Sequence, residues 1–478
     1  MTIARKVVYN VFVSAFSKIV STALALLAIG FITRYLGPEG FGKYTTALAF
    51  FALFMALADF GLNTVSAREI SRKDADEKKI MGNVFTLRIG ISFIMILLGL
   101  GIIFFLPYED DLKGAILLSL IAFFFSSSYT VLNGIFQKRL IMDRVALIEV
   151  LGKTLQFVFV IGAVHWNLGL LAIMSAFIAF MVFNASLLFW WSHRFVPFSF
   201  QFDFQFWKKF LQQSFPLGLA TILTFFYFKF DAILLSFLKG TEAVGIFGAA
   251  YKIIENATFF PAMIAGLILP LLARHIGNDM AGFKRIADAM AKTFLLIVVP
   301  LFIGGFILAE DIILLIGGEE FLASVPVLQI LLFSLTFMFF GNFFNTLLIV
   351  DNKQKLLVKL LFICVIVNLS LNFILIPKYS YLGVAISSAF TELLVVFLTG
   401  FSVYKTQKYL FPFGKVFRIF VSGMIMAGAI FIISPYTHFF ITLPFAMGIY
   451  ALAILVTQAV EKQEWQEIFF RKKEIHYK

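Results

Sequence analysis

Ten charged side chains fall within otherwise apolar stretches of this sequence, and they are its best candidates for chemistry. Five are basic and five are acidic: Lys18, Arg88, Lys153, Lys229, Lys252, Asp59, Glu149, Asp231, Glu255 and Glu392. A charged side chain at the centre of a membrane-spanning helix costs about 2.5–3.5 kcal/mol on the insertion scale. We therefore expect these side chains to face a water-filled cavity inside the protein. The lysines and the arginine are suited to binding the phosphate oxygens of an anionic cargo there.

Four of these charges could instead form structural ion pairs. Glu149 and Lys153 are four residues apart, so they share a face of a helix. Lys252 and Glu255, three residues apart, share a face as well. For these residues a cargo contact and a local ion pair are both open.

The other basic residues differ in their surroundings. Lys18 and Arg88 fall near helix ends, where a long side chain can snorkel to water instead of lining a cavity. Lys229 lies deep within its apolar stretch. Asp231 follows two residues later and points away from Lys229, so we expect no ion pair between them.

Two acids complete the set. Asp59 precedes Phe60-Gly61, where a turn or a cap competes with a functional role. Glu392 is a candidate proton or cation site. Acids within the membrane permit ion coupling, although they do not require it.

Metal ligands and cofactor motifs are scarce in the sequence. The single cysteine, Cys364, excludes a disulfide framework and a thiolate metal cage. The five histidines are scattered and offer no cluster for a metal: His165, His193, His275, His438 and His476. We expect neither a metal nor a cofactor.

One motif imitates a phosphate-binding loop. Residues 37–43 read G-x-x-x-x-G-K, but Tyr44 stands where a magnesium-binding Ser or Thr is required. An apolar helix rather than a strand precedes the motif. We therefore expect no ATP binding.

The composition indicates the elements that must position the charges. Of 478 residues, 61% are hydrophobic and 14% are charged, against about 25% charged in soluble domains. This excludes a soluble enzyme, a disordered chain and a fibrous repeat. Because the apolar runs are continuous rather than alternating, they predict an all-α polytopic membrane protein. We predict about 14 transmembrane helices, near residues 11–33, 44–63, 83–106, 113–136, 145–164, 169–191, 213–238, 244–272, 289–309, 324–349, 359–376, 382–404, 416–434 and 441–460.

The basic residues indicate the orientation of these helices. A net charge of +12 would suggest nucleic acid as a partner of a soluble protein. If the N-terminus is cytoplasmic, however, 29 of the 39 Lys and Arg residues fall on the cytoplasmic side and five in external turns. We therefore predict that both termini are cytoplasmic and that nucleic acid is not a partner.

An internal repeat divides the chain into two lobes. Residues 37–44 and 240–247 both read G-x-E-x-x-G-x-aromatic, each in an external turn. The two copies are six spans apart, which predicts two six-helix lobes in parallel topology. The expected order is an N-terminal lobe, an interfacial cytoplasmic linker, a C-terminal lobe, two extra C-terminal helices and a cytoplasmic tail. Their respective residues are 1–198, 199–212, 213–404, 405–460 and 461–478.

Several short motifs carry a family resemblance. In the first half they are RYLGPEGFG at 34–42, ADFGL at 58–62 and REI at 68–70. In the second half they are YFKFD at 227–231, EAVGIF at 242–247, AAYK at 249–252, and the stretch from Val367-Asn368 through Asn372 to Ile376-Pro377. Together they resemble polysaccharide flippases of the Wzx type. These belong to the MOP superfamily, which also holds the MATE drug antiporters and lipid II flippases.

The resemblance implies a MATE-like, V-shaped transporter that is not an enzyme. It would move an undecaprenyl-diphosphate-linked oligosaccharide from the cytoplasmic to the outer leaflet of the bacterial inner membrane, for surface polysaccharide synthesis. Its partners would be this cargo, membrane lipids and the polysaccharide polymerase machinery. A lipid II flippase or a cation-coupled multidrug exporter stays open as an alternative. A membrane polymerase or ligase is disfavoured, because the external turns are short and carry no catalytic groups.

Overall fold

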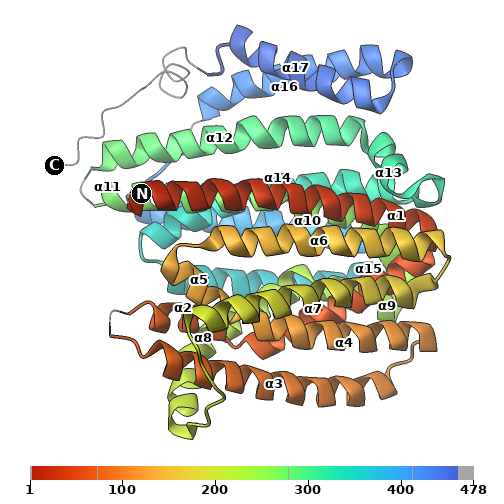
Figure 1. The fold of residues 1–478 in the computed structure, drawn as a ribbon. Helices are drawn as coiled ribbons and strands as arrows, with labels where there is room; N and C mark the ends of the chain where they lie inside the picture. The colour runs from red at the N-terminus through yellow and green to blue at the C-terminus, as the bar shows by residue number, and fades with distance from the viewer. Residues whose placement is uncertain (1–2, 73, 278, 412, 461–478) are drawn as a thin grey trace. The chain divides into compact units, whose positions relative to one another are not determined.

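The structure is a computed structural model that describes residues 3–72, 74–277, 279–411 and 413–460. Within these ranges every regular element is a helix (Figure 1). The all-α prediction is therefore confirmed. The predicted tail, 461–478, lies outside the described residues.

Two very long helices each consist of two segments. α1 (Ile3–Asp59) has 57 residues, which is about 85 Å and nearly three times the hydrocarbon thickness of a bilayer. Gly37 interrupts it with φ 64° and ψ −177°, and Pro38 follows. α15 (Gln354–Gln407) is interrupted at Ser380, with φ 51° and ψ −129°. Each of these helices is long enough to supply two membrane spans.

The apolar helices define a multi-pass membrane protein. Among the described residues, 11 helices are long and apolar enough to cross a membrane. The number is 12 if α8 (Phe204–Phe228) and α9 (Phe230–Lys239), which meet at 44°, form one span. Since α1 and α15 contain two segments each, this number is consistent with the 14 spans that the sequence predicts.

The chain forms two compact units, and unit 1 comprises Met1–Ala249, Leu315–Phe321 and Asn372–Val384. Besides α1, α8 and α9 it contains α2 (Leu62–Ile70), α3 (Glu77–Phe105), α4 (Asp110–Thr130), α5 (Asn133–Arg139), α6 (Met142–His165), α7 (Gly169–Phe195) and the start of α10 (Thr241–Ala257). In this unit α1 packs on α6, α6 on α7, α7 on α4 and α4 on α3 (Figure 1).

The two ends of unit 1 carry different charged residues and are called the basic end and the acidic end. The basic end carries Lys79, Arg139, Arg144 and Arg194, and the acidic end carries Glu39, Glu109 and Asp111.

A short connection fixes the start of α8 on α3. Asn83 of α3 donates to the Gln201 side chain at 2.9 Å and accepts from the Asp203 backbone N–H at 3.0 Å. Asp203 caps α8 by accepting a hydrogen bond from the backbone N–H of Phe206, which lowers the pKa of the Asp203 carboxyl below its ordinary value. Helix α8 therefore begins within residues 199–212, the segment predicted as an interfacial linker, and continues without a break into the span.

Unit 2 comprises Ala250–Leu314, Leu322–Leu371 and Ala385–Lys478. Its helices include α11 (Phe259–His275), α12 (Met280–Ile307), α13 (Ala309–Gly317, whose end belongs to unit 1), α14 (Ser324–Val350), α16 (Phe413–Ile433) and α17 (Phe439–Val456). α12 packs on α14 and α16, and α16 packs on α17. The division into two six-helix lobes stays a prediction.

Candidate functional site

Arg88 occupies the interior of unit 1 and is wholly buried, with 0% exposure. Its Nη1 donates to the Ala58 carbonyl at 2.6 Å, and its Nε donates to the Ser127 carbonyl at 3.2 Å. Nη1 also lies 3.4 Å from a carboxylate oxygen of Asp59, the last residue of α1. The next two residues turn the chain into α2 with φ of 42° and 73°, so the turn expected at Asp59 is present. Arg88 thus fastens the end of α1 to α3 and α4.

A cation from α1 pairs with an acid from α6. Lys18 Nζ lies 3.6 Å from Glu149 Oε1, and both side chains are about half exposed. Lys153, which the spacing offered as the partner of Glu149, donates to Gln156 at 3.0 Å and lies 4.2 Å from the ring centroid of Phe180. Because α1 packs along α6, it places Lys18 beside Glu149. The ion pair of Glu149 therefore joins two helices and does not lie along α6.

The third group lies where a membrane span breaks. α8 ends at Phe228, α9 starts at Phe230, and half-buried Lys229 sits between them with φ −128° and ψ −21°. The break is ten residues from the end of α9 at Lys239, about 15 Å, which is half the thickness of the hydrocarbon core. Irregular backbone at this depth is found where it is buried in protein or lines a cavity. Broken helices of this kind form the ligand sites of many transporters.

The start of α9 is tied to a distant part of the chain. Asp231, 4% exposed, accepts a hydrogen bond from the side chain of Asn372 at 2.7 Å. Asn372 is wholly buried and belongs to unit 1. The break therefore places Lys229 two residues before Asp231, a buried acid whose carboxylate accepts a hydrogen bond from the Asn372 amide.

Three of the predicted charges lie in unit 2. Lys252 Nζ is 2.9 Å from Glu255 Oε2, which confirms the pairing that their spacing predicts. Glu392 of α15 is 5% exposed and follows Thr391, whose hydroxyl accepts a hydrogen bond from the Asn368 side chain at 3.3 Å. These three predicted charges therefore form one local ion pair and one buried acid that follows a hydrogen-bonded threonine.

The structure thus gathers the ten predicted residues into separate groups. Seven lie in unit 1 and three in unit 2. A shared central cavity, and the role of each cation as a contact for the cargo, stay predictions. The sequence interpretation missed Gln156 and Ser127, and it named Asn372 within a family motif without predicting its contact with Asp231. Gln156 carried a usable signal, because it is a polar residue within an apolar run.

The two copies of the glycine repeat contact each other at the acidic end. A Cβ atom on Gly42 would overlap the carbonyl oxygen of Thr241, and one on Gly245 would overlap the carbonyl oxygen of Pro38. Gly42 and Gly245 occupy equivalent positions in the repeat, as do Pro38 and Thr241. The contact is therefore reciprocal, as between two equivalent elements around a twofold axis. It requires glycine, because backbone meets backbone without room for a side chain.

A second glycine contact lies at the turn between α1 and α2. A Cβ on Gly61 would stand 2.6 Å from the Ser214 carbonyl oxygen, and one on Gly218 would stand 2.5 Å from the Cα of Phe60. The second segment of α1 therefore meets the start of α10 near its first residues and α8 just beyond its last one. Lys229 lies between these two contacts along the chain.

Lys43, the lysine of the apparent phosphate-binding loop, is surrounded by carboxylates. Its Nζ lies 3.0 Å from Glu39, 2.7 Å from Glu109 and 2.8 Å from Asp111. The side chain is only 12% exposed. Three anions around the ammonium group repel phosphate, and they join the second segment of α1 to the turn between α3 and α4.

We expect Lys43→Gln to destabilise the protein without removing a cargo contact. The substitution leaves three carboxylates facing one another, and loss of charged hydrogen bonds at this partly exposed site should cost about 1–2 kcal/mol. The measurement is thermal unfolding of the purified protein in detergent, with Lys113→Gln as a control from the same region. Equal stability of the two variants would show that the ion pairs of Lys43 with the three carboxylates do not stabilise the protein.

Proteins hold metal ions with sets of His, Cys, Asp and Glu ligands. Across the part of the chain that the structure describes, no three His, Cys, Asp or Glu side chains are grouped so that they could hold a metal ion. The charged groups that do occur combine lysines with carboxylates and amides, which suits recognition of a polar or ionic ligand.

The fold and these groups define a class: a multi-pass, all-helical membrane protein with buried charges, a broken span and backbone contacts between repeated turns. The profile of the family described as "Polysaccharide biosynthesis protein" matches residues 7–275, and the MatE profile matches residues 216–374. The chain belongs to the polysaccharide biosynthesis protein family. The resemblance seen in the sequence motifs is thereby confirmed.

Named relatives and solved structures agree with this family. A "Putative O-antigen transporter" of Shigella flexneri is 25% identical and covers 81% of this chain and 94% of its own length. The "Capsular polysaccharide biosynthesis protein CapF" of Staphylococcus aureus is 23% identical over 79% of this chain and 94% of its own. The lipid II flippase MurJ, in an inward closed conformation, superposes with a TM-score of 0.76 at 16% identity, covering 95% of this chain and 99% of MurJ. An inward-facing MATE family transporter gives 0.64 at 17% identity, covering 83% and 99%. These structures show that the fold is like that of MurJ and of the MATE family transporter.

Proposed function

We propose that the chain is a flippase that carries an undecaprenyl-diphosphate-linked oligosaccharide across a membrane for surface polysaccharide synthesis. Membership of the polysaccharide biosynthesis family supports this function, and so do relatives named for O-antigen transport and capsular polysaccharide synthesis. These names point to transport rather than to an enzyme. The proposed location is the bacterial inner membrane, with both termini cytoplasmic, and the polymerase machinery would receive the cargo.

The observation that carries the proposal is the break between α8 and α9. Lys229 precedes the ten residues of α9, so it would lie near the middle of the membrane, where its compact ammonium charge would bind the diphosphate. The glycine contacts on either side of it along the chain are suited to closing a site at its two ends. Lys18, Lys153 and Lys252 are proposed as further contacts for the headgroup, and Glu392 as a coupling acid. Arg88, wholly buried on backbone carbonyls, is proposed to hold the helices in place.

Alternating access would proceed by opening one glycine contact while the other stays closed. The headgroup would enter from the cytoplasm, occupy the charged region and leave to the outside, while its tail stays in lipid. A diphosphate with two negative charges moving outward gains roughly 4–5 kcal/mol per 100 mV of inside-negative potential. The membrane potential alone can therefore drive the step, and an ion gradient can add to it.

The proposal predicts that Lys229→Ala lowers the flipping rate at least tenfold. Removing a charged hydrogen-bond donor from a partly buried anion site costs about 1.5–3 kcal/mol, which corresponds to roughly 10- to 150-fold. The assay reconstitutes the purified protein in proteoliposomes with a labelled undecaprenyl-diphosphate oligosaccharide and measures its transfer between leaflets.

Lys239→Ala is the matched control, because Lys239 is the exposed last residue of α9, the helix that starts directly after Lys229. It should flip at the wild-type rate. Equal rates in both variants at equal stability would remove Lys229 as a headgroup contact. Lipid II and an organic cation with an imposed ion gradient are tested in the same vesicles. Transport of either one, without transport of the oligosaccharide lipid, would instead establish the corresponding alternative.

A further inference from the structure

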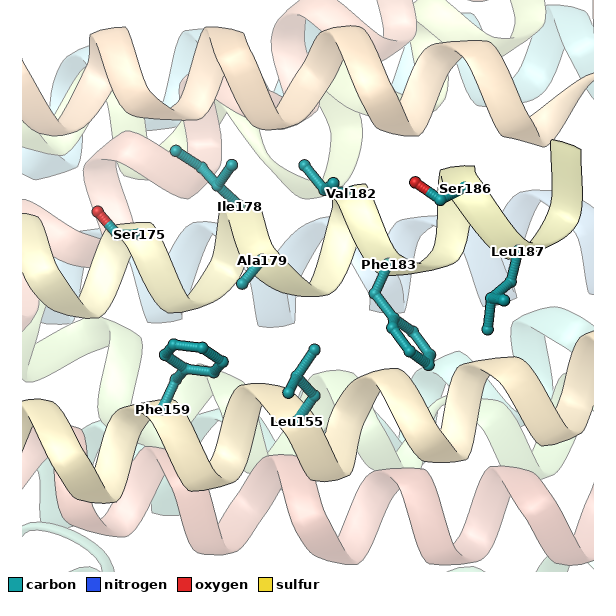
Figure 2. A pocket seen from close by; sticks show the side chains of 9 residues that line it. All are labelled: Leu155, Phe159, Ser175, Ile178, Ala179, Val182, Phe183, Ser186 and Leu187. Carbon is teal, nitrogen blue, oxygen red and sulfur yellow. The ribbon is translucent and has the colours of Figure 1, made fainter. Parts of the chain in front are cut away.

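An apolar groove runs along the outer surface between α6 and α7. It encloses about 640 Å³. Leu155 and Phe159 of α6 face Ala179, Phe183 and Leu187 of α7 across it (Figure 2). Both helices belong to unit 1. The groove thus lies within one compact unit, and its volume is within the range of pockets that bind small apolar ligands.

The groove lies on the opposite side of α6 from Lys153. Leu155 follows Lys153 by two residues, which places the two side chains about 200° apart around the helix. Lys153 and Gln156 bond to each other on the polar side. The groove therefore faces the hydrocarbon of the bilayer rather than the proposed path of the headgroup.

Two arginines extend the same helix faces at the basic end. Arg144 precedes Leu155 by eleven residues, about three turns, and Arg194 follows Leu187 by seven residues, about two turns. Both therefore lie on the side of their helix that lines the groove. Arg144 stacks 5.2 Å from the ring of Trp191, and Arg194 stacks 3.8 Å from the ring of Trp190. In the described part of the chain neither guanidinium forms an ion pair, so their N–H groups can receive a phosphate.

We propose that this groove docks the polyprenyl tail of the lipid cargo, with its diphosphate on Arg144 and Arg194. The proposal rests on the proposed function, because it adds a docking site outside the charged interior for the same lipid. Charge complementarity selects an anionic lipid. Length selects a polyprenyl chain: Arg194 and Ser175, at the far end of the groove, are 19 residues apart, about 28 Å. An acyl chain of one leaflet covers about 15 Å, half of the hydrocarbon core, whereas a long polyprenyl chain with its diphosphate on Arg194 can reach the far end of the groove.

The test measures binding of undecaprenyl diphosphate and of the short farnesyl diphosphate to the purified full-length protein in detergent. Ala179→Trp fills the groove and should raise the Kd for undecaprenyl diphosphate about tenfold, with no change for farnesyl diphosphate. The double variant Arg144→Gln/Arg194→Gln should weaken both ligands. Gly101→Trp is the matched control, because Gly101 of α3 is exposed, with no atom within 4 Å of an added Cβ. It should bind both ligands as the wild type does.

Three results would overturn the proposal. The first is an unchanged Kd for undecaprenyl diphosphate in a stably folded Ala179→Trp protein. The second is equally tight, equally Trp-sensitive binding of dioleoylphosphatidylglycerol, which would make the groove a general lipid surface. The third is a change of oligomeric state in Ala179→Trp, which would assign the groove to a second copy of the chain.

The experiments can refute the proposed docking groove and the proposed flippase function independently. The expected binding pattern without any flipping by the wild type would refute the function and leave the groove. Normal flipping together with an unchanged Kd in Ala179→Trp would refute the groove and leave the function.

Discussion

Gly42→Leu should abolish flipping while the protein still folds. Its side chain would occupy the position of the Thr241 carbonyl, so the reciprocal contact at the acidic end could not close. Overpacking of this kind costs about 1–3 kcal/mol or more, which shifts a two-state equilibrium by roughly 5- to 150-fold toward the open state. Flipping in proteoliposomes gives the first measurement.

Thiol labelling gives the second measurement for Gly42. The natural Cys364 is buried, so a Thr45→Cys substitution beside Gly248 introduces a reporter with little background. Labelling of this cysteine should rise when Gly42→Leu is added. Gly245→Leu should behave in the same way, because its contact is the equivalent one, whereas Gly101→Leu on exposed α3 should flip normally. Wild-type flipping by Gly42→Leu would show that the glycine contact is not part of the transport cycle.

Arg88→Ala should prevent accumulation of stable protein. It leaves the Ala58 and Ser127 carbonyls and the Asp59 carboxylate without their donor inside the helix packing. Breaking such a buried charged network costs about 3–5 kcal/mol, a large part of the stability of an ordinary domain. The measurement is the yield and thermal unfolding of the protein in detergent.

Arg72→Ala provides the comparison for Arg88. Arg72 is an exposed arginine that pairs with Glu69 at 2.8 Å, and its loss should cost at most about 1 kcal/mol. If Arg88→Ala were instead as stable as the wild type and slow only in flipping, Arg88 would be a headgroup contact, as its position in the sequence first suggested.

Much of the fold follows from the sequence because the membrane restricts it. Continuous apolar runs must become helices, since lipid offers no partners for backbone groups. The run at 213–238 nevertheless breaks at Lys229, between α8 and α9. Breaks of this kind depend on packing partners such as Asn372, which lies 141 residues from Asp231 along the chain. Local patterns carry no information at that range.

The candidate site was predictable only in part, for a similar reason. The spacing of Lys252 and Glu255 fixes their pairing, because one helix positions both residues. The pairing of Lys18 with Glu149 depends on which helix lies beside α6, and helical spacing cannot supply that. Composition marked Arg88 as a costly charge, but whether such a charge meets water or backbone carbonyls is decided by tertiary packing.

The reciprocal contact between Gly42 and Gly245 is made of peptide backbone, so its strength should be indifferent to pH and ionic strength. Capture of a phosphate by lysine ammonium groups is, in contrast, screened by salt. Raising the salt concentration should therefore slow the loading of cargo but leave the sealing of the acidic end intact. A barrier that depends on shape alone would keep ions from leaking through during each cycle, whatever the composition of the fluid outside.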